Sequence, residues 1–270
     1  MIELFENDVK LFDRHSSKGN QLKWEKDGIW YKADYTGYEG LAEYVISHLL
    51  MKSTLKTDEF VVYDLEEIKY KRQIFHGAKS GNFLQEGWQI VTLQRLYKIR
   101  YNRSFMEDVW RIPDIKNRIL FLVEQVEQLT GIKDFGIYIS KLLTIDAFFL
   151  NEDRHMHNIA VLMNGDGKAM LCPFFDQGAG LMSDTTMDYP LGNEPVDMMG
   201  DVKAKTICQN FDDALDAVEM LYGSQMHFLF DRHDVENIIA PITIYTEEEK
   251  ARVETIILQQ IRKYQYLFLI

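Results

Sequence analysis

The spacing of hydrophobic positions changes at about residue 98 of the chain. Before it, short apolar and aromatic runs predict strands over residues 28–33, 60–63 and 89–93. Turn-rich segments, at 16–20 and 76–82, separate these runs. One helix is expected within this region, because residues 38–50 carry apolar side chains at i, i+3, i+4 spacing.

After residue 98 the apolar spacing is that of helices. Amphipathic helices are predicted over residues 117–130, 212–222 and 246–267, and a helix buried nearly all round over 136–150. Gly131 and Gly223 mark two helix ends, and Thr246 with Glu249 forms a capping-box pattern at a helix start. The pattern predicts an α+β fold with two lobes, a small β-rich one over 1–97 and a larger helical one over 98–270.

A β-hairpin is predicted inside the helical part. Two apolar runs, 159–163 and 169–175, flank the turn sequence Asn164-Gly165-Asp166-Gly167. The segment N-E-D-R-H-M-H-N precedes the hairpin, and Asp176-Gln177-Gly178 follows it. Because a hairpin fixes the distance between its two ends, we expect Asn158 and Asp176 to converge on one cavity.

Charge and composition narrow the function classes. The 270 residues include 30 Lys and Arg against 42 Asp and Glu, a net charge of −12 that disfavours a general nucleic-acid binder. Only two cysteines are present, too few for a disulfide framework, which indicates a reducing, intracellular environment. The first residues lack the pattern of a signal peptide, and no apolar run is long enough to span a membrane. We therefore expect a cytoplasmic protein.

The order of polar residues around the hairpin suits phosphoryl transfer. That reaction needs a carboxylate to orient the attacking hydroxyl, oxygen ligands for Mg²⁺ and a cation on the nucleotide phosphates. Asp153 stands five residues before Asn158, and Asp176 follows the hairpin and precedes x-Gly. This is the order of groups in protein kinases, and one carboxylate with one amide oxygen suits Mg²⁺.

The segment N-E-D-R-H-M-H-N followed by C-P-F-F-D-Q-G resembles the HipA-like Ser/Thr kinases, which carry N-x-D-x-H-x-x-N and then P-x-Y-D. The motif D-R-H-x-x-N also resembles that of the phosphatidylinositol 3/4-kinases, which share the kinase-like fold. The resemblance, from about Ser16 to Asp176, implies a bilobal kinase-like fold, ATP and Mg²⁺ as cofactors and a protein substrate with a Ser/Thr acceptor. It implies that Asp153 is the base, that Asn158 and Asp176 bind Mg²⁺, and that His155 positions the catalytic loop or a phosphate.

The resemblance extends to the N-terminal part. The residues S-S-K-G-N-Q-L-K resemble the family's phosphate loop, S-x-x-G-x-Q-x-K, and imply nucleotide contacts by Ser16, Gly19 and Lys23. Lys32 resembles the lysine that holds the α/β-phosphates. Glu39 and Glu43 are both candidates for the glutamate that pairs with it. We favour Glu43, because the sequence E-Y-V-I-S-H-L-L that begins there matches the family's helix pattern better.

Three further expectations follow from the resemblance. The adenine hinge would use backbone groups around Gln94 to Leu96, and residues 76–82 would form a loop on the nucleotide side. Ser16 is at the position where the family carries a self-phosphorylated serine. Phosphorylation there would lower activity by adding charge in a loop that cradles phosphates.

Other interpretations remain at this stage. His155 and His157 form an H-x-H pair, but zinc needs four ligands and both cysteines are far away in the sequence. Asp146 and Arg154 are expected in structural ion pairs. Ser183, Thr185 and Thr186 follow Asp176 in a segment like an activation loop and are candidates for phosphorylation.

Two rival functions use the same fold. One is a kinase of a small molecule or lipid headgroup, for which residues 69–72 are a candidate basic patch; the other is a non-catalytic nucleotide-binding regulator. The resemblance does not extend to the N-terminal region that contacts the antitoxin in HipA, so it leaves an antitoxin partner in doubt. The resemblance places the protein in a bacterial cytoplasm, or elsewhere after delivery without a signal peptide.

Overall fold

The computed structural model describes residues 1–9 and 21–269. Contacts between residues divide the chain into two compact units. The first comprises Met1–Phe83, Phe175–Val202 and His227–Ile270, and the second Leu84–Phe174 and Lys203–Met226. Each unit is thus built from segments that are separated in the sequence. The division into two lobes near residue 98 stays a prediction.

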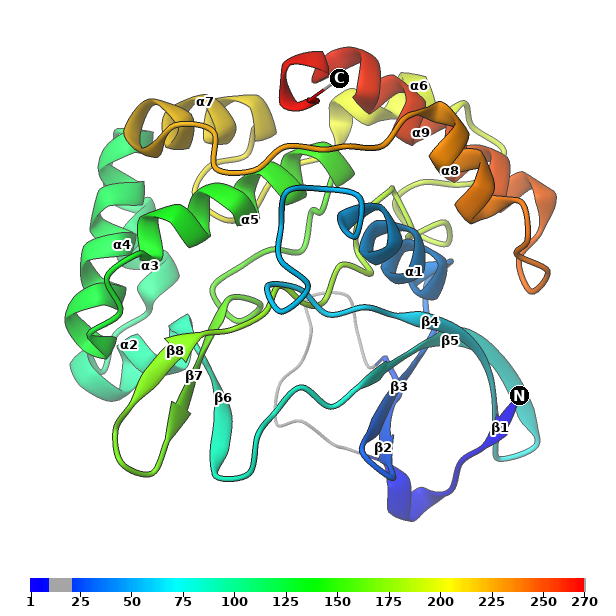
Figure 1. Ribbon diagram of the computed structural model, residues 1–270, viewed down its shortest axis with the longest axis horizontal. Helices are drawn as coiled ribbons and strands as arrows, with labels where there is room; N and C mark the ends of the chain where they lie inside the picture. Colours follow the sequence, from blue (N-terminus) through cyan, green and yellow to red (C-terminus); the bar gives the residue numbers. More distant parts are fainter. Residues whose placement is uncertain (10–20, 270) are drawn as a thin grey trace. The chain divides into compact units, whose positions relative to one another are not determined.

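The first unit is built on a five-stranded sheet in the order β1-β4-β5-β3-β2 (Figure 1). Its strands are β1 (Ile2–Glu3), β2 (Lys23–Lys26), β3 (Ile29–Ala33), β4 (Asp64–Tyr70) and β5 (Gln73–Gly81). β1 pairs in parallel with β4, and the other pairs are antiparallel. Trp24, Tyr31 and Ile68 belong to the apolar cluster on one face of this sheet.

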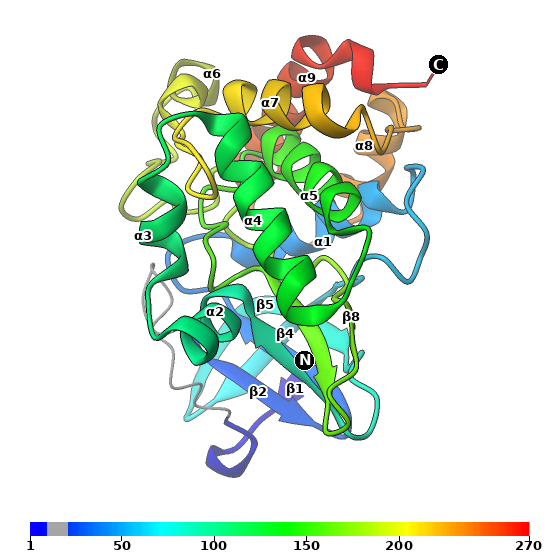
Figure 2. The ribbon, with the colours of Figure 1, turned by 90° about the vertical axis from the view of Figure 1, so that its left-hand side faces the viewer.

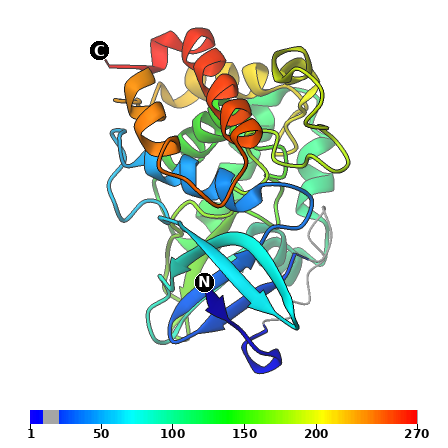
Figure 3. The ribbon, with the colours of Figure 1, turned by 90° about the vertical axis from the view of Figure 1, so that its right-hand side faces the viewer.

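Helices complete the first unit. They are α1 (Glu39–Leu50), α6 (Pro195–Met198), α8 (Arg232–Ile239) and α9 (Glu247–Lys263), with 3-10 turns at Glu6–Asp8, Met199–Asp201 and Gln265–Leu267. α1 packs against β5 and β4 and is contacted by α8 (Figure 3). The predicted capping box of Thr246 and Glu249 is confirmed at the start of α9.

The second unit contains a three-stranded antiparallel sheet in the order β6-β7-β8, with β6 (Trp88–Thr92), β7 (Ala160–Asn164) and β8 (Ala169–Leu171). Its helices are α2 (Leu93–Tyr101), α3 (Phe105–Trp110), α4 (Ile115–Thr130), α5 (Phe135–Phe149) and α7 (Phe211–Tyr222). α4, α5 and α7 lie side by side (Figure 2). α5 is buried along most of its length, as its apolar sequence predicted.

Two predictions of local structure are wrong. Residues 76–82 were expected to form a loop, but Gln73–Gly81 is strand β5, paired on both sides. Its glycines suggest a turn, yet Gly77 is required because a side chain there would overlap the Lys32 carbonyl oxygen. Residues 60–63 were expected to be a strand, but the strand begins only at Asp64. The hairpin is confirmed, although its second strand ends at Leu171 rather than at residue 175.

Asp34 ties the end of β3 to the start of α1 and to the segment before α9. Its carboxylate accepts hydrogen bonds from the Gly40 backbone N–H, at 2.6 Å, and from the Tyr245 hydroxyl, at 2.7 Å. Burial raises the pKa of Asp34 to about 8, and the charge of Glu39 contributes in the same direction. The folded state therefore binds a proton at Asp34 more tightly than the unfolded chain does.

We expect stability to depend on pH through Asp34. The stability gained from binding a proton at Asp34 is fully present below the ordinary pKa of 3.8, and it is lost as the pH rises through about 8. The variant Asp34→Asn keeps the shape and has no such titration. Urea unfolding from about pH 5 to about pH 9 should show the wild type losing stability relative to Asp34→Asn. Parallel pH profiles of the two proteins would contradict the assignment.

None of the helices that the described residues form is long and apolar enough to cross a membrane.

Candidate nucleotide and metal site

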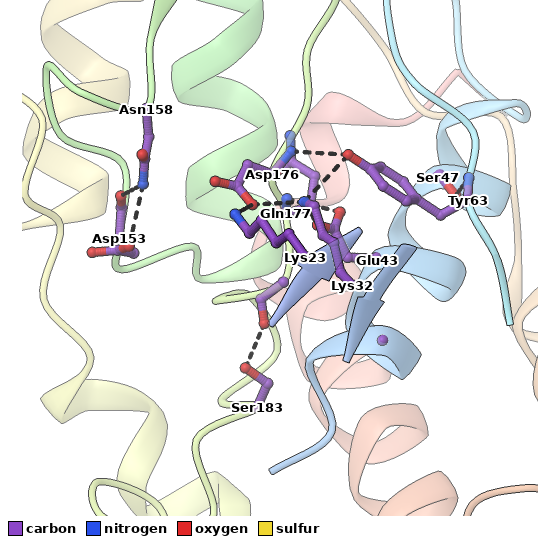
Figure 4. Close-up of polar contacts among 12 residues, drawn as sticks. Lys23, Lys32, Glu43, Ser47, Tyr63, Asp153, Asn158, Asp176, Gln177 and Ser183 are labelled. Carbon is purple, nitrogen blue, oxygen red and sulfur yellow. Dashed lines mark hydrogen bonds and ion pairs between the residues drawn. The ribbon is translucent and has the colours of Figure 1, made fainter. Parts of the chain in front are cut away.

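Lys32 lies between two carboxylates in the first unit. β3 places Tyr31 and Ala33 on the apolar face of the sheet and Lys32 on the opposite face, because successive side chains of a strand alternate. The Lys32 Nζ donates to Glu43 Oε1 at 2.6 Å and to Asp176 Oδ1 at 2.7 Å (Figure 4). Burial alone would lower the pKa of Lys32, but the charges of Asp176 and Glu43 outweigh it and raise that pKa well above its ordinary value.

The choice between the two glutamates of α1 is decided by geometry. Glu39 turns toward the preceding residues, and its carboxylate accepts from the backbone N–H groups of Tyr35, Thr36 and Gly37. It thereby fixes the three residues that lead into the helix. Glu43, one turn later and almost fully buried, pairs with Lys32. The predicted pairing of Lys32 with Glu43, rather than with Glu39, is confirmed.

Glu43 also holds the segment that contains Asp176. Its second oxygen, Oε2, accepts the backbone N–H of Gln177 at 2.9 Å. Gly178 follows, and a Cβ atom there would lie 3.3 Å from the Glu39 Cβ and 3.5 Å from the Glu43 Cγ. The Asp-x-Gly sequence thus packs directly against α1, which explains why the third residue is small.

The backbone at Asp176 is in the left-handed region, with φ of 62°. This conformation is uncommon for residues other than glycine, although Asp and Asn tolerate it, and it tends to occur where surrounding contacts hold it. The carboxylate also lies 3.9 Å from Lys23 Nζ. Lys23 and Lys32 therefore bring two cations to the Asp176 carboxylate, and both belong to the predicted nucleotide site.

Tyr63 is a member of this site that the sequence did not reveal. Its ring lies 5.0 Å from Lys32 Nζ, and its hydroxyl lies 3.5 Å from the same atom and accepts the Asp176 backbone N–H at 3.4 Å. Burial raises the pKa of Tyr63 well above its ordinary range, so the hydroxyl stays neutral. The Tyr63 backbone N–H donates to Ser47 of α1. An aromatic residue just before a strand carries no sequence signal for this role.

We expect Glu43→Gln to lower the free energy of unfolding by about 1–3 kcal/mol, because a glutamine offers one acceptor oxygen where two donors, Lys32 and Gln177, are now satisfied. Lys32 keeps its contact with Asp176 in this variant. Urea unfolding measures the loss. The control is Glu86→Gln, at an exposed glutamate. Equal effects of the two substitutions would argue against the bridging role of Glu43.

The second unit holds the predicted catalytic loop. The Asn158 side-chain amide donates to the Asp153 carbonyl oxygen at 2.8 Å and to Asp153 Oδ2 at 3.2 Å (Figure 4). Because the amide nitrogen is used in this way, the amide oxygen is the atom left to bind a cation. His155 Nε2 lies 3.7 Å from Asp153 Oδ1, consistent with a role in positioning the loop.

Asp146 and Arg154 anchor this loop to α5. The Arg154 Nε lies 3.2 Å from each oxygen of Asp146, and the guanidinium also donates to the Asn158 carbonyl oxygen. Burial raises the pKa of Asp146 to about 6, and the charge of Arg154 opposes that rise. The predicted structural ion pairing of Asp146 and Arg154 is confirmed.

Several predicted site residues are elsewhere or are not described. Gln94 and Leu96 lie in the first turn of α2, and the Gln94 backbone N–H donates to Met156, so this donor is already used within the second unit. Recognition of adenine there stays a prediction. Ser16 and Gly19 lie outside the described residues. Ser183 is buried and donates to the Gly178 carbonyl oxygen, whereas Thr186 is exposed.

The side chains that each unit offers are of the kind that Mg²⁺ and a nucleotide use. Asp176 of the first unit carries a carboxylate and Asn158 of the second an amide oxygen, and both are hard oxygen ligands of the type that Mg²⁺ takes in proteins. Their convergence on one cavity stays a prediction. Lys32 and Lys23 supply positive charge beside Asp176.

The α+β fold of this chain is a kinase-like fold. Nineteen chains of solved structures match it. One is the crystal structure of a Helicobacter pylori proinflammatory kinase, CtkA, with a TM-score of 0.62 and 16% sequence identity over 97% of this chain and 94% of that one. No protein-family model and no curated protein matches the chain. The predicted fold class is therefore confirmed, and membership of the HipA-like family stays a prediction.

Proposed function

We propose that this protein is an ATP- and Mg²⁺-dependent phosphotransferase that acts on serine or threonine of a protein substrate. The observation that carries the proposal is the Lys32 ammonium held between Glu43 and Asp176 in a chain with a kinase-like fold. Burying a lysine with two carboxylates has a large desolvation cost, which makes it a poor choice for a purely structural element. A nucleotide site, in contrast, needs a fixed cation next to a metal ligand.

Each residue has a distinct role in this proposal. Lys32, braced by Glu43, holds the α/β-phosphates, and Lys23 adds positive charge nearby. Asp176 and Asn158 are the protein ligands of Mg²⁺, which supplies charge neutralisation on the phosphates when bound. Asp153 orients the acceptor hydroxyl and takes its proton, and its contact with Asn158 fixes its direction.

The lipid alternative gains no support from the basic segment at residues 69–72. Lys69 pairs with Glu3 at 2.9 Å, and Lys71 pairs with Glu6 at 2.6 Å. Both cations are thus partly neutralised by acidic neighbours, which weakens attraction to an anionic surface.

Two measurements test the proposal. Thermal unfolding with ATP, with and without Mg²⁺, should show stabilisation that depends on the metal, since a ligand that binds only the folded state raises stability. Transfer of ³²P from labelled ATP to a serine or threonine of a protein should then be detected. Metal-dependent stabilisation without transfer to protein, lipid or small molecule would favour a non-catalytic regulator. Transfer only to a lipid or small molecule would favour the rival kinase class.

A further inference from the structure

The loop that follows Asp176 is attached to the turn between β3 and α1. The Tyr38 backbone N–H donates to the Ser183 carbonyl oxygen at 3.1 Å, and the Thr186 N–H donates to the Thr36 carbonyl oxygen at 2.9 Å. The buried Tyr38 hydroxyl donates to the Leu181 carbonyl oxygen at 2.8 Å. Three hydrogen bonds thus join residues 181–186 to residues 36–38, all within the first unit.

Gly37 is the residue that allows this attachment. A Cβ atom on Gly37 would overlap the Ser183 carbonyl oxygen and would lie 2.8 Å from both the backbone nitrogen and the hydroxyl oxygen of Thr185. Since φ at Gly37 is not in the left-handed region, the glycine is needed for close approach of two backbones rather than for an unusual conformation. Any side chain would push the loop away from the turn.

The attached loop is held in a costly conformation. Leu181 and Met182 both have positive φ, at 54° and 55°, although neither is a residue that favours the left-handed region. Both side chains are buried. Such backbone strain persists where surrounding contacts determine it, and here those contacts include the turn at residues 36–38.

The loop leads directly back to the Lys32 site. Ser183 Oγ donates to the Gly178 carbonyl oxygen at 2.6 Å, and Gly178 packs against Glu39 and Glu43. Gln177, which immediately precedes Gly178, donates its backbone N–H to Glu43. Asp176 is the residue before Gln177. Displacement of residues 181–186 would therefore act through Ser183 and Gly178 on the contact between Gln177 and Glu43.

We propose that Gly37 is a positioning residue, which seats the 178–186 loop on the start of α1 and thereby fixes Asp176 and Glu43 around Lys32. Gly37 is not among the residues that pair with Lys32 or Asp176 in the contacts described above. Its effect on them is therefore exerted through the loop. The consequence for turnover rests on the proposed phosphotransferase function, whereas the seating of the loop does not.

The test compares Gly37→Ala with Gly192→Ala. Gly192 belongs to the same unit, is exposed, and has nothing within 4 Å of the position of an added Cβ atom. Residue-resolved amide hydrogen exchange follows Thr186, which reports the attachment, and Gln177, which reports the contact with Glu43. In Gly37→Ala both amides should exchange about tenfold faster or more, and Gly192→Ala should match the wild type. Turnover at saturating ATP should fall about 10²-fold in Gly37→Ala alone.

Tyr38→Phe provides a milder variant in case Gly37→Ala does not fold. It removes only the hydroxyl that binds the Leu181 carbonyl, so Gln177 and Thr186 exchange should accelerate about fivefold, as expected for one hydrogen bond. Wild-type exchange at both amides in folded Gly37→Ala, or in Tyr38→Phe, would overturn the proposal. A wild type without phosphotransfer, in which Gly37→Ala still accelerates Gln177 exchange, would support the positioning and count only against the proposed function.

Discussion

Replacing Asp153 with asparagine should lower phosphotransfer by about 10²–10⁴-fold, the contribution of a well-positioned acid–base group. The substitution keeps the volume and one acceptor oxygen, so the hydrogen bonds from the Asn158 amide can persist and the loop should stay in place. What is lost is the carboxylate that we propose to accept the hydroxyl proton. Steady-state kinetics with labelled ATP measures the loss, and calorimetry should show little change in ATP affinity.

The control for Asp153→Asn is Asp166→Asn, which alters an exposed aspartate in the turn between β7 and β8. That variant should retain wild-type turnover. If Asp153→Asn instead kept normal turnover and lost nucleotide affinity, the group would contact the nucleotide and the proposed role as base would be wrong.

The variant Asp176→Asn should lose Mg²⁺-dependent turnover by about 10²–10³-fold, because it removes the carboxylate that we propose as a ligand of the metal. Asparagine is a better test than alanine, since it tolerates the left-handed backbone that residue 176 adopts. Lys32 keeps its ion pair with Glu43, so the variant should fold. Thermal unfolding with ATP should show that the additional stabilisation by Mg²⁺ disappears.

Asp58→Asn serves as the matched control, because Asp58 is exposed and belongs to the same unit as Asp176. Its response to Mg²⁺ and ATP should equal that of the wild type. Full metal-dependent turnover in Asp176→Asn would remove Asp176 from the metal site, and with it the reason for placing Mg²⁺ next to Lys32.

Predictions made from the sequence succeeded where the determining interactions are local. The helix at Glu39–Leu50, α9 and the longer helices of the second unit follow from apolar spacing. Thr246 at the start of α9 and Gly131 at the end of α4 mark helix ends, because they satisfy terminal backbone groups or allow the chain to turn. The short helices α2, α3 and α8 were not predicted, because six to nine residues carry little periodicity. Strand β5 was mistaken for a loop because Gly77, which suggests a turn in the sequence, serves close packing against β3, a strand distant in the sequence.

The sequence by itself determined the order of chemical groups: a lysine on a strand, two glutamates on the next helix, Asp153 and Asn158 before a hairpin, and Asp176 after it. Only the tertiary structure decided which glutamate meets Lys32, that Tyr63 belongs to the site, and that the loop after Asp176 rests on Gly37. Glu39 and Glu43 lie on one helical face, so local spacing cannot distinguish them. The distinction arises because residues more than a hundred positions apart, Glu43 and Gln177, are brought within one hydrogen bond by packing.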